Sequence, residues 1–562
     1  MPEYDPQEEQ LIRKLDKKLI PLLALLYLAS LVDRGTLFHA RVTNHATASG
    51  LKHDLGVSDD AYVVALVVYG IASVLLVFPS TFGLRMFGPA RWLAGIVAGW
   101  GFLAACSAAT STLAGWVVVQ ILMGALQAGF LPGILLYILS FYTREEWASR
   151  MSWVVSSGTV ATSFFGIFVD WGSQFDGAKG LQTWKWMFVC SGLFSIVIGA
   201  VTVMFLPDYP QTCAFLTPAD RVLAVARGHD GSEGGVHESE EEETQRRKSV
   251  TPRLKGPRVR FDSGQLIEAL TDKRNWLFAF AFCFISVAMD ALISVGPEVT
   301  ATSFSLTTQF LETHEKDPNA VENAIEAADG TRQARIFAAI PYLIGGIVAP
   351  IFSWNSDRTG DRALHATLPL MASSLGFALL AFVPVTLAHA GPVRYFLGLL
   401  PATAGVVAAY PCLLAYALDK AQGDTSRVAV AAITFSIGQA FSPAISSPGS
   451  VLLRDSTAPT GHAVGLGVCA CGVALSAASV LLIRWLYRGD ETQMWGKGPA
   501  LRRLLNDEDE DKAWGVELSQ ADMFGSISGK GKKPRKASGF WSDRRDSNAG
   551  SDWDLKEYAS TK

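Results

Sequence analysis

Two neighbouring charges interrupt the first apolar stretch of this 562-residue chain. Residues 19–42 read LIPLLALLYLASLVDRGTLFHARV and carry Asp33 and Arg34 side by side. A charged side chain at membrane depth costs at least about 2.5–3.5 kcal/mol on insertion scales, so such residues usually face a polar interior and are functional. Adjacent residues of a helix point in different directions, so Asp33 and Arg34 cannot face the same way. The alternative interpretation is a structural pair at a helix end.

A further carboxylate interrupts a later apolar stretch, FAFAFCFISVAMDALISVG. Asp290 lies 15 residues beyond Asn275, just as Asp33 lies 15 residues beyond Lys18. At about 1.5 Å per residue, both carboxylates lie some 22 Å from the starts of their helices. Burial favours the neutral form of a carboxylate, which suits a group that gains and loses a proton. We therefore expect Asp33 or Asp290 to bind a coupled proton, and Arg34 to attract an anionic group. The alternative is that Asp290 is a neutral, hydrogen-bonded residue.

A polar segment between two later apolar stretches carries charges of both signs. It reads SWNSDRTGDR at residues 353–362 and contains Asp357, Arg358 and Arg362. Arginines that anchor a loop on the positive side of a membrane would not need the acidic Asp357. We therefore expect these three residues to pair across the ends of neighbouring helices.

The elements that must hold these residues are apolar helices long enough to cross a bilayer. Hydrophobic residues make up 49% of the chain and charged residues 18%, against about 25% charged in an average protein. The apolar residues gather in blocks of about 20, which match a hydrocarbon core about 30 Å thick. The sequence therefore predicts an all-α membrane protein with 12 transmembrane helices in two six-helix bundles. The expected spans are 19–40, 61–84, 92–111, 115–142, 150–171, 184–206, 276–299, 333–355, 365–388, 393–418, 427–452 and 463–487.

On this interpretation the chain has five segments. They are a cytoplasmic N-terminal segment (1–18), an N-terminal bundle (19–206), a partly disordered cytoplasmic linker (207–275), a C-terminal bundle (276–487) and a disordered cytoplasmic tail (488–562). Apolar spacing before residue 19 predicts a short amphipathic helix that leads into the first span. In the linker, Asp262 with Gln265 three residues later predicts the capped start of a surface helix along the inner leaflet. The basic run RRKS, which ends at Ser249, is a candidate kinase site.

Lysines and arginines of the short loops are more frequent on the side of the N-terminus, which predicts that both termini are cytoplasmic. The expected location is the plasma membrane, with a vacuolar membrane as the alternative. The seven cysteines show no metal-ligand spacing, so no metal site is expected. The chain has no P-loop, GxSxG or HExxH sequence, which argues against an ATP-driven pump or an enzyme. No nucleic-acid partner and no cofactor are expected, apart from a proton as coupling ion.

Several motifs resemble those of the major facilitator superfamily. The segment SWNSDRTGDR resembles its loop signature, and GLRMFGPAR at residues 83–91 resembles the equivalent loop without its acidic residue. GALQAGFLPGILLYILSFYTREEWASRM and LPDYPQTCAFLTPADR resemble one branch, the fungal anion:cation symporters of the allantoate permease type. The resemblance covers residues 8–490, without the central loop and the insertion between spans seven and eight.

This resemblance implies parallel six-helix halves that bind a small organic substrate between them and move it by alternating access. Family substrates are mostly organic anions and carboxylates taken up with protons. The resemblance also implies that Asp357, Arg358 and Arg362 form a gating latch. Asp357 would then lie near the positive, N-terminal end of a facing helix.

The chain departs from this branch inside its expected binding region. Span four of the branch carries an arginine and a glutamate where this chain has Gln120 and Gln127, which share a helix face seven residues apart. Two asparagines of the branch are replaced by Thr36 and His39. A glutamine binds substrate by hydrogen bonds but carries neither charge nor proton, so a typical substrate cannot be assumed. Tyr410 is a further candidate contact, although we favour a packing role for it.

Two alternatives to proton-coupled uptake stay open. The replaced charges of span four weaken the inference of proton-coupled uptake, so the first alternative is an exporter of a secondary metabolite. The long linker and tail leave room for the second, a non-transporting nutrient sensor of the same fold.

Overall fold

The computed structural model describes residues 6–39, 51–56, 58–229, 262–303, 332–383, 393–421, 423–446 and 463–487. All secondary structure within these ranges is helical. The kinase-site prediction at Ser249, most of the insertion between spans seven and eight, and the tail from residue 488 lie outside the described residues.

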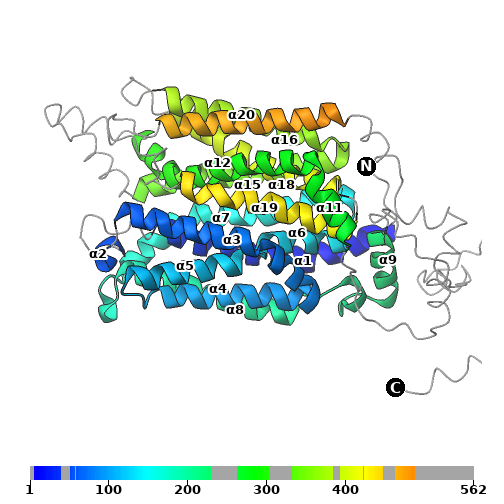
Figure 1. Ribbon diagram of the computed structural model, residues 1–562, viewed down its shortest axis with the longest axis horizontal. Helices are drawn as coiled ribbons and strands as arrows, with labels where there is room; N and C mark the ends of the chain where they lie inside the picture. Colours follow the sequence, from blue (N-terminus) through cyan, green and yellow to red (C-terminus); the bar gives the residue numbers. More distant parts are fainter. Residues whose placement is uncertain are drawn as a thin grey trace, which may run out of the picture. The chain divides into compact units, whose positions relative to one another are not determined.

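The helices form two groups that lie side by side, blue to cyan and green to orange in Figure 1. The long helices of the first group correspond to the six expected N-terminal spans. They are α1 (Pro6–His39), α3 (Asp59–Phe87), α4 (Pro89–Ser107), α5 (Leu113–Gln127) with α6 (Phe130–Phe141), α7 (Trp147–Ser173) and α8 (Thr183–Phe205). The short helix α2 (Leu51–Leu55) precedes α3.

The second group also contains six spans. Its helices are α12 (Lys273–Ser303), α15 (Arg332–Thr359), α16 (Arg362–Phe382), the π-helical turn η5 (Arg394–Leu399) with α18 (Leu400–Asp419), α19 (Asp424–Ser446) and α20 (Ala463–Leu486). Ten spans of the described chain are long and apolar enough to cross a membrane. The long helices α1 and α19 occupy the positions of the first and eleventh expected spans, which completes the two bundles of six.

The first helix joins two predicted elements. The sequence predicted a short amphipathic helix that leads into the first span, and α1 runs unbroken for 34 residues through both. Pro21 lies inside the helix, where it removes one backbone hydrogen bond without ending the helix. Leu11, Leu15 and Leu19 are fully buried on one face that continues across the expected boundary. This common buried face explains why the helix does not stop.

Span four is broken where its glycines allow close packing. α5 ends at Gln127 and α6 begins at Phe130. A Cβ atom on Gly129 would lie 2.0 Å from the hydroxyl oxygen of Ser80. Only glycine therefore fits against α3 at the break.

The LPDYP sequence after α8 has a structural role. Its Asp208 accepts a hydrogen bond from the backbone N–H of Ala90 (3.0 Å) at the first turn of α4. Gly88, just before α4, has a φ of 89°, which favours glycine, and a Cβ there would contact the Asp208 carboxylate. The hydroxyl of Tyr137 donates to the Pro207 carbonyl (2.8 Å). The segment thus ties the end of α8 to α4 and α6.

The linker contains more helix than its polar composition predicts. Besides the short η4 (Pro210–Thr212), it forms α9 (Pro218–His229) and α11 (Ser263–Thr271). Asp262 caps α11 as predicted, by accepting a hydrogen bond from the N–H of Gly264. Gln265 does not complete a capping box: its side-chain oxygen accepts from the backbone N–H of Thr425 (3.2 Å) at the start of α19. A tertiary contact therefore outweighs the local one.

The two bundles meet through matching pairs of helices. α7 of the first bundle packs on α15 of the second, and α3 packs on α19. In Figure 1 the start of α1, α9 and α11 lie at one end of the bundles, and α2 lies at the other. The end that carries α9 and α11 is called the charged end below.

Candidate functional site

A buried ion pair joins the first helices of the two bundles. The Nη2 atom of Arg34 in α1 lies 3.2 Å from the Oδ2 atom of Asp290 in α12. The side chains are 19% and 6% exposed, respectively. Removing one member of a buried pair leaves an uncompensated charge, which typically costs about 3–5 kcal/mol. Because the partners come from different bundles, the pair links the position of one bundle to that of the other.

Phenol groups surround this pair from both bundles. Tyr27 of α1, Tyr69 of α3 and Tyr410 of α18 are all close enough to interact electrostatically with Arg34. Tyr342 of α15 interacts in the same way with Asp290. A phenol binds by its hydroxyl and also offers an aromatic face. The site can therefore contact both polar and flat apolar parts of a molecule.

Asp33 faces away from the pair and into its own bundle. Its Oδ2 atom accepts hydrogen bonds from the indole N–H of Trp100 in α4 (2.8 Å) and from the hydroxyl of Ser195 in α8 (2.5 Å). Its Oδ1 atom has no hydrogen-bond partner among the described residues. The side chain is 1% exposed, and all its described donors are neutral. The structure thus separates Asp33 from Asp290, although both residues were expected at matching depth.

The two glutamines of span four have different surroundings. The Oε1 atom of Gln127 accepts a hydrogen bond from the hydroxyl of Tyr69 (2.5 Å), which connects it to the tyrosines around Arg34. Gln120 is fully buried, and its amide oxygen and nitrogen have no hydrogen-bond partner in the described part of the chain. Such a group costs free energy unless something binds it.

The remaining predicted site residues divide into three cases. Tyr410 packs its ring on Phe282, with ring centres 5.0 Å apart, and also lies near Arg34. Thr36 is fully buried and donates to the Val32 carbonyl of its own helix. His39 is the last residue of α1, and its side chain lies outside the described residues.

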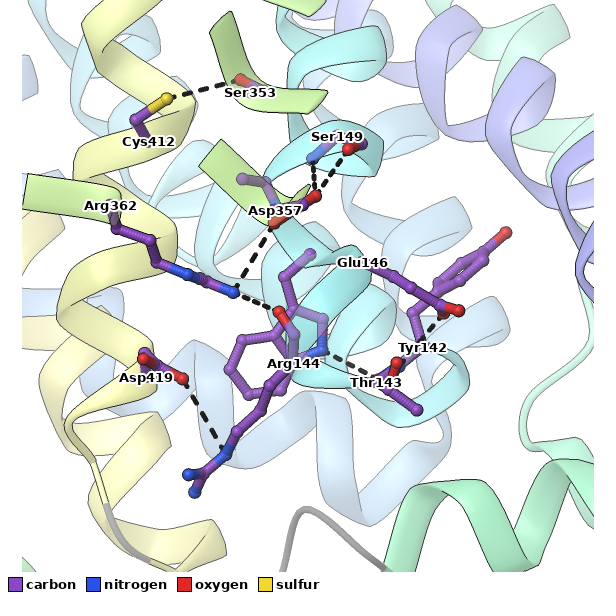
Figure 2. A network of polar contacts seen from close by, with 12 residues as sticks. Tyr142, Thr143, Arg144, Glu146, Ser149, Ser353, Asp357, Arg362, Cys412 and Asp419 are labelled. Atoms are coloured by element: carbon purple, nitrogen blue, oxygen red, sulfur yellow. Dashed lines mark hydrogen bonds and ion pairs between the residues drawn. The ribbon is translucent and has the colours of Figure 1, made fainter. Parts of the chain in front are cut away.

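A second cluster of polar contacts joins the bundles at the charged end (Figure 2). Asp357 of α15 accepts hydrogen bonds from the backbone N–H groups of Ala148 (3.3 Å) and Ser149 (2.7 Å) in the first turn of α7. The Ser149 hydroxyl also donates to it. A carboxylate at a helix N-terminus satisfies unpaired N–H groups and the helix dipole. This is the arrangement that the resemblance implied for Asp357.

Arg362 of α16 belongs to the same cluster. Its guanidinium lies 3.6 Å from Asp357 and donates to the backbone carbonyl of Arg144. The Arg144 side chain in turn lies 3.9 Å from Asp419 at the end of α18. Arg358 behaves differently from its prediction: it is exposed and lies over the ring of Trp354 in its own helix. An arginine one helical position from Asp357 points to another face, which removes it from the cluster.

Sequence reasoning missed most partners of these residues. Trp100, Ser195 and Tyr69 carry no motif, although a polar group inside an apolar block is itself a signal. Asp419 and Arg144 look like ordinary loop charges. Which helix faces meet is a tertiary property, and no spacing along one helix encodes it.

The arrangement of the charged residues suits binding and conformational change. Within the described residues, no group of three or more His, Cys, Asp or Glu side chains is placed to hold a metal ion. The Arg34–Asp290 pair lies where the bundles meet, and the Asp357 cluster joins them at one end. An exchangeable charge pair and a separate set of contacts at one end suit a protein that opens alternately on two sides.

Comparisons with known proteins agree with this architecture. Residues 23–447 match the family model described as Major Facilitator Superfamily. The chain is 28% identical over 461 residues to the MFS transporter prlL of a fungal species, which covers 82% of this chain and 83% of that protein. It is 23% identical over 518 residues to the major facilitator-type transporter hxnP of Emericella nidulans, covering 90% and 92% of the two chains.

A solved structure shows the same fold. The xylose transporter XylE from E. coli, in a partially occluded inward-open conformation, superposes with a TM-score of 0.51 and 12% sequence identity. The match covers 83% of this chain and 97% of that chain.

Proposed function

Because the chain belongs to the major facilitator superfamily, it is a membrane transporter, and we propose that it moves a small organic anion together with a proton by alternating access. The observation that carries this proposal is the ion pair between Arg34 and Asp290. Arg34 is a cation at the meeting point of the bundles, and its partner is a group that can be neutralised by one proton.

The pair supplies a simple coupling rule. A substrate carboxylate that binds Arg34 takes the place of Asp290. A proton that binds Asp290 cancels the charge of this carboxylate and so releases Arg34 for the substrate carboxylate. Substrate and proton therefore bind together, and each leaves when the other does.

Asp33 has a different role in this proposal. Its hydrogen bonds from Trp100 and Ser195 hold α1 against α4 and α8 of the same bundle. Asp33 then positions Arg34, and Asp290 is the proton site. The hydrogen bonds of Asp33 inside its own bundle support assigning the proton to Asp290 rather than to Asp33.

Finer features of the proposal come from the sequence resemblance. We place the protein near the allantoate permease type of symporter, in the plasma membrane, with both termini and the charged end in the cytoplasm. Export of a metabolite uses the same site in the opposite direction. A nutrient sensor would bind at this site without net flux.

The first experiment identifies substrate and direction together. Metabolites inside and outside cells are compared with the protein present, absent, and replaced by Arg34→Gln. Uptake predicts a metabolite that is depleted outside only with the intact protein, and export predicts its enrichment outside. If no metabolite differs between intact protein and Arg34→Gln while both are equally abundant in the membrane, the transport proposal is wrong and a sensor is favoured.

The second experiment tests coupling with the metabolite so identified, in proteoliposomes with an acidic exterior. Intact protein should accumulate it against a gradient, and a protonophore should abolish accumulation. Asp290→Asn should retain exchange of labelled for unlabelled substrate but lose accumulation, whereas Asp33→Asn should retain both, because an amide oxygen still accepts from Trp100 and Ser195. Accumulation that survives Asp290→Asn and fails with Asp33→Asn would move the proton site to Asp33.

A further inference from the structure

The loop before α7 has contacts on two sides. One side is the Asp357 cluster already described, in which the second bundle binds the backbone of Arg144 and Ser149. The other side carries the three-residue turn η2 (Arg144–Glu146), whose last residue, Glu146, is 1% exposed. Figure 2 shows Glu146 pointing away from Asp357 and Arg362. Residues 142–150 are called the hub below.

Arg227 of α9 meets the hub from this second side. Its Nη2 atom donates to the Oε1 atom of Glu146 at 2.5 Å, and its Nε atom lies 3.7 Å from the Oε1 atom of Glu8 in α1. The three side chains are at most 2% exposed. A cation so deeply buried between two carboxylates is costly to remove, because the two acids would then repel each other.

Glu146 links its contact with Arg227 to the backbone conformation of the hub. Its Oε2 atom accepts the backbone N–H of Thr143 (3.3 Å), which closes the turn η2. This turn sets the direction of the Arg144 carbonyl, which accepts a hydrogen bond from Arg362. It also sets the direction of the N–H groups of residues 148 and 149, which donate to Asp357. One carboxylate thus joins α9 to the groups that the second bundle binds.

The linker is held at both of its ends. α9 contacts the first bundle through Arg227, and α11 contacts the second through Gln265 and Thr425. The chain between His229 and Asp262 connects these two anchors. The helix at the start of the linker is therefore attached to the hub itself.

We propose that Arg227 is a positioning residue for the contacts between the bundles, and that the Arg227–Glu146 pair couples the linker to closure of the charged end. This inference rests on the alternating-access function proposed above and on the gating role that the family resemblance implies for Asp357 and Arg362. Loss of the pair should loosen η2 and weaken both contacts of the second bundle, although Arg227 touches neither Asp357 nor Arg362 in the described contacts.

The test measures the distance between the bundles at the charged end. Spin labels are placed at Met86 of α3 in the first bundle and at Ile267 of α11, which contacts α19 of the second bundle. Both positions lie outside the hub and are 77% and 61% exposed, respectively. A genetically encoded keto amino acid carries the labels, so the native cysteines stay in place. Full-length protein in lipid nanodiscs is measured by pulsed electron resonance, without substrate.

Four variants separate the explanations. Asp357→Asn removes the proposed latch directly. Arg227→Gln and Glu146→Gln break the pair from either side, so the proposal is still testable if one of them does not fold. Asp220→Asn is the matched control, because Asp220 also lies in α9 and binds Lys14 of α1 (2.7 Å), while none of its described contacts involves the hub.

The expected result is a shift from short to long distances in Asp357→Asn, and a shift in the same direction in Arg227→Gln and Glu146→Gln. Arg227→Lys should restore the short distances, and Arg227→Gln should add nothing in the Asp357→Asn background. Asp220→Asn should match the intact protein.

Three outcomes overturn the proposal, each in a different way. If Asp357→Asn shifts the distances and the Arg227 and Glu146 variants do not, the coupling is wrong and the latch survives. If Asp220→Asn shifts them equally, docking of α9 as a whole matters rather than the Arg227–Glu146 pair. If Asp357→Asn itself has no effect, the proposed latch fails, and this inference fails with it.

Discussion

Arg34 and Asp290 lie in α1 and α12, the first helices of the two bundles. Each neutralises the charge of the other in a place where neither is well solvated. The cost of such a pair is mostly that of removing both groups from water. The surrounding tyrosines donate or accept hydrogen bonds without adding charge. The stability of this site therefore depends on the balance of its two charges more than on either side chain alone.

This balance predicts strong non-additivity between the two residues. Arg34→Gln and Asp290→Asn should each lower the thermal unfolding temperature in detergent, because each leaves one buried charge, worth about 3–5 kcal/mol. The double variant should recover a large part of that loss. The exposed pair Arg13–Glu9, with side chains 76% and 56% exposed, is the control, and its double-mutant cycle should show almost no coupling. Additive losses at Arg34 and Asp290 would contradict the interpretation of the pair.

The depth of these residues was predictable from the sequence, but their partners were not. Counting residues from a helix end gives the height of a side chain, because each residue advances the helix by about 1.5 Å. The direction of the side chain around the helix axis depends on how the whole helix is rotated in the bundle. The sequence therefore predicts the same depth for Asp33 and Asp290. In the structure, however, the residue that pairs with Asp290 is Arg34.

The contacts at the charged end were more accessible to prediction. Asp357 lies in a short motif, and a carboxylate beside a helix start has an obvious set of donors. Arg358 was wrongly grouped with it, because the two residues are neighbours in α15 and adjacent residues of a helix point in different directions. Arg227 gave no signal, since α9 lies in a polar segment that looks like a linker.

Helices of this protein approach one another at two kinds of interface, one inside a bundle and one between bundles. Inside the second bundle, a Cβ on Gly405 of α18 would lie 2.3 Å from the Pro369 carbonyl of α16. Between bundles, a Cβ on Gly346 of α15 would lie 2.3 Å from the hydroxyl oxygen of Thr159 in α7. The same substitution should therefore have different consequences at the two places.

Gly405→Ala should reduce stability, by about 1–3 kcal/mol for an overpacked site, because the clash persists however the bundles are arranged. Gly346→Ala should instead separate α7 from α15 and lengthen the distance between spin labels on the two bundles, with little effect on unfolding temperature. Thr159→Ala removes the clashing oxygen and should restore the distance in the Gly346→Ala background. Equal unfolding losses in both glycine variants would show that the α7–α15 interface is as permanent as the bundle interior.

Across the chain, the transporting part ends well before the last residue. The family match ends at residue 447, and α20, the last helix in the described part of the chain, ends at Leu486. Residues 488–562 lie outside the described residues, and the contacts described above join the helices of both bundles without them.

A chain shortened by removal of residues 490–562 should therefore transport its substrate at a rate within about twofold of the full chain, at equal abundance in the membrane. The measurement is initial transport rate in vesicles, with Arg34→Gln as the inactive control. Loss of a cellular response in the shortened protein, with no flux in either form, would favour the nutrient sensor instead.

The ion pair between Arg34 and Asp290 also has an electrical consequence. The positive charge of Arg34 and the negative charge of Asp290 cancel. When the bundles rearrange, the pair therefore carries no net charge across the membrane potential. A lone arginine would experience about 2.3 kcal/mol for each 100 mV of membrane potential that it crossed. The substrate-free transporter, with this ion pair intact, can therefore reorient at the same rate in polarised and depolarised membranes. Imposing a potassium diffusion potential on proteoliposomes should then leave the return step unchanged, and only the pH difference should set how far the substrate accumulates.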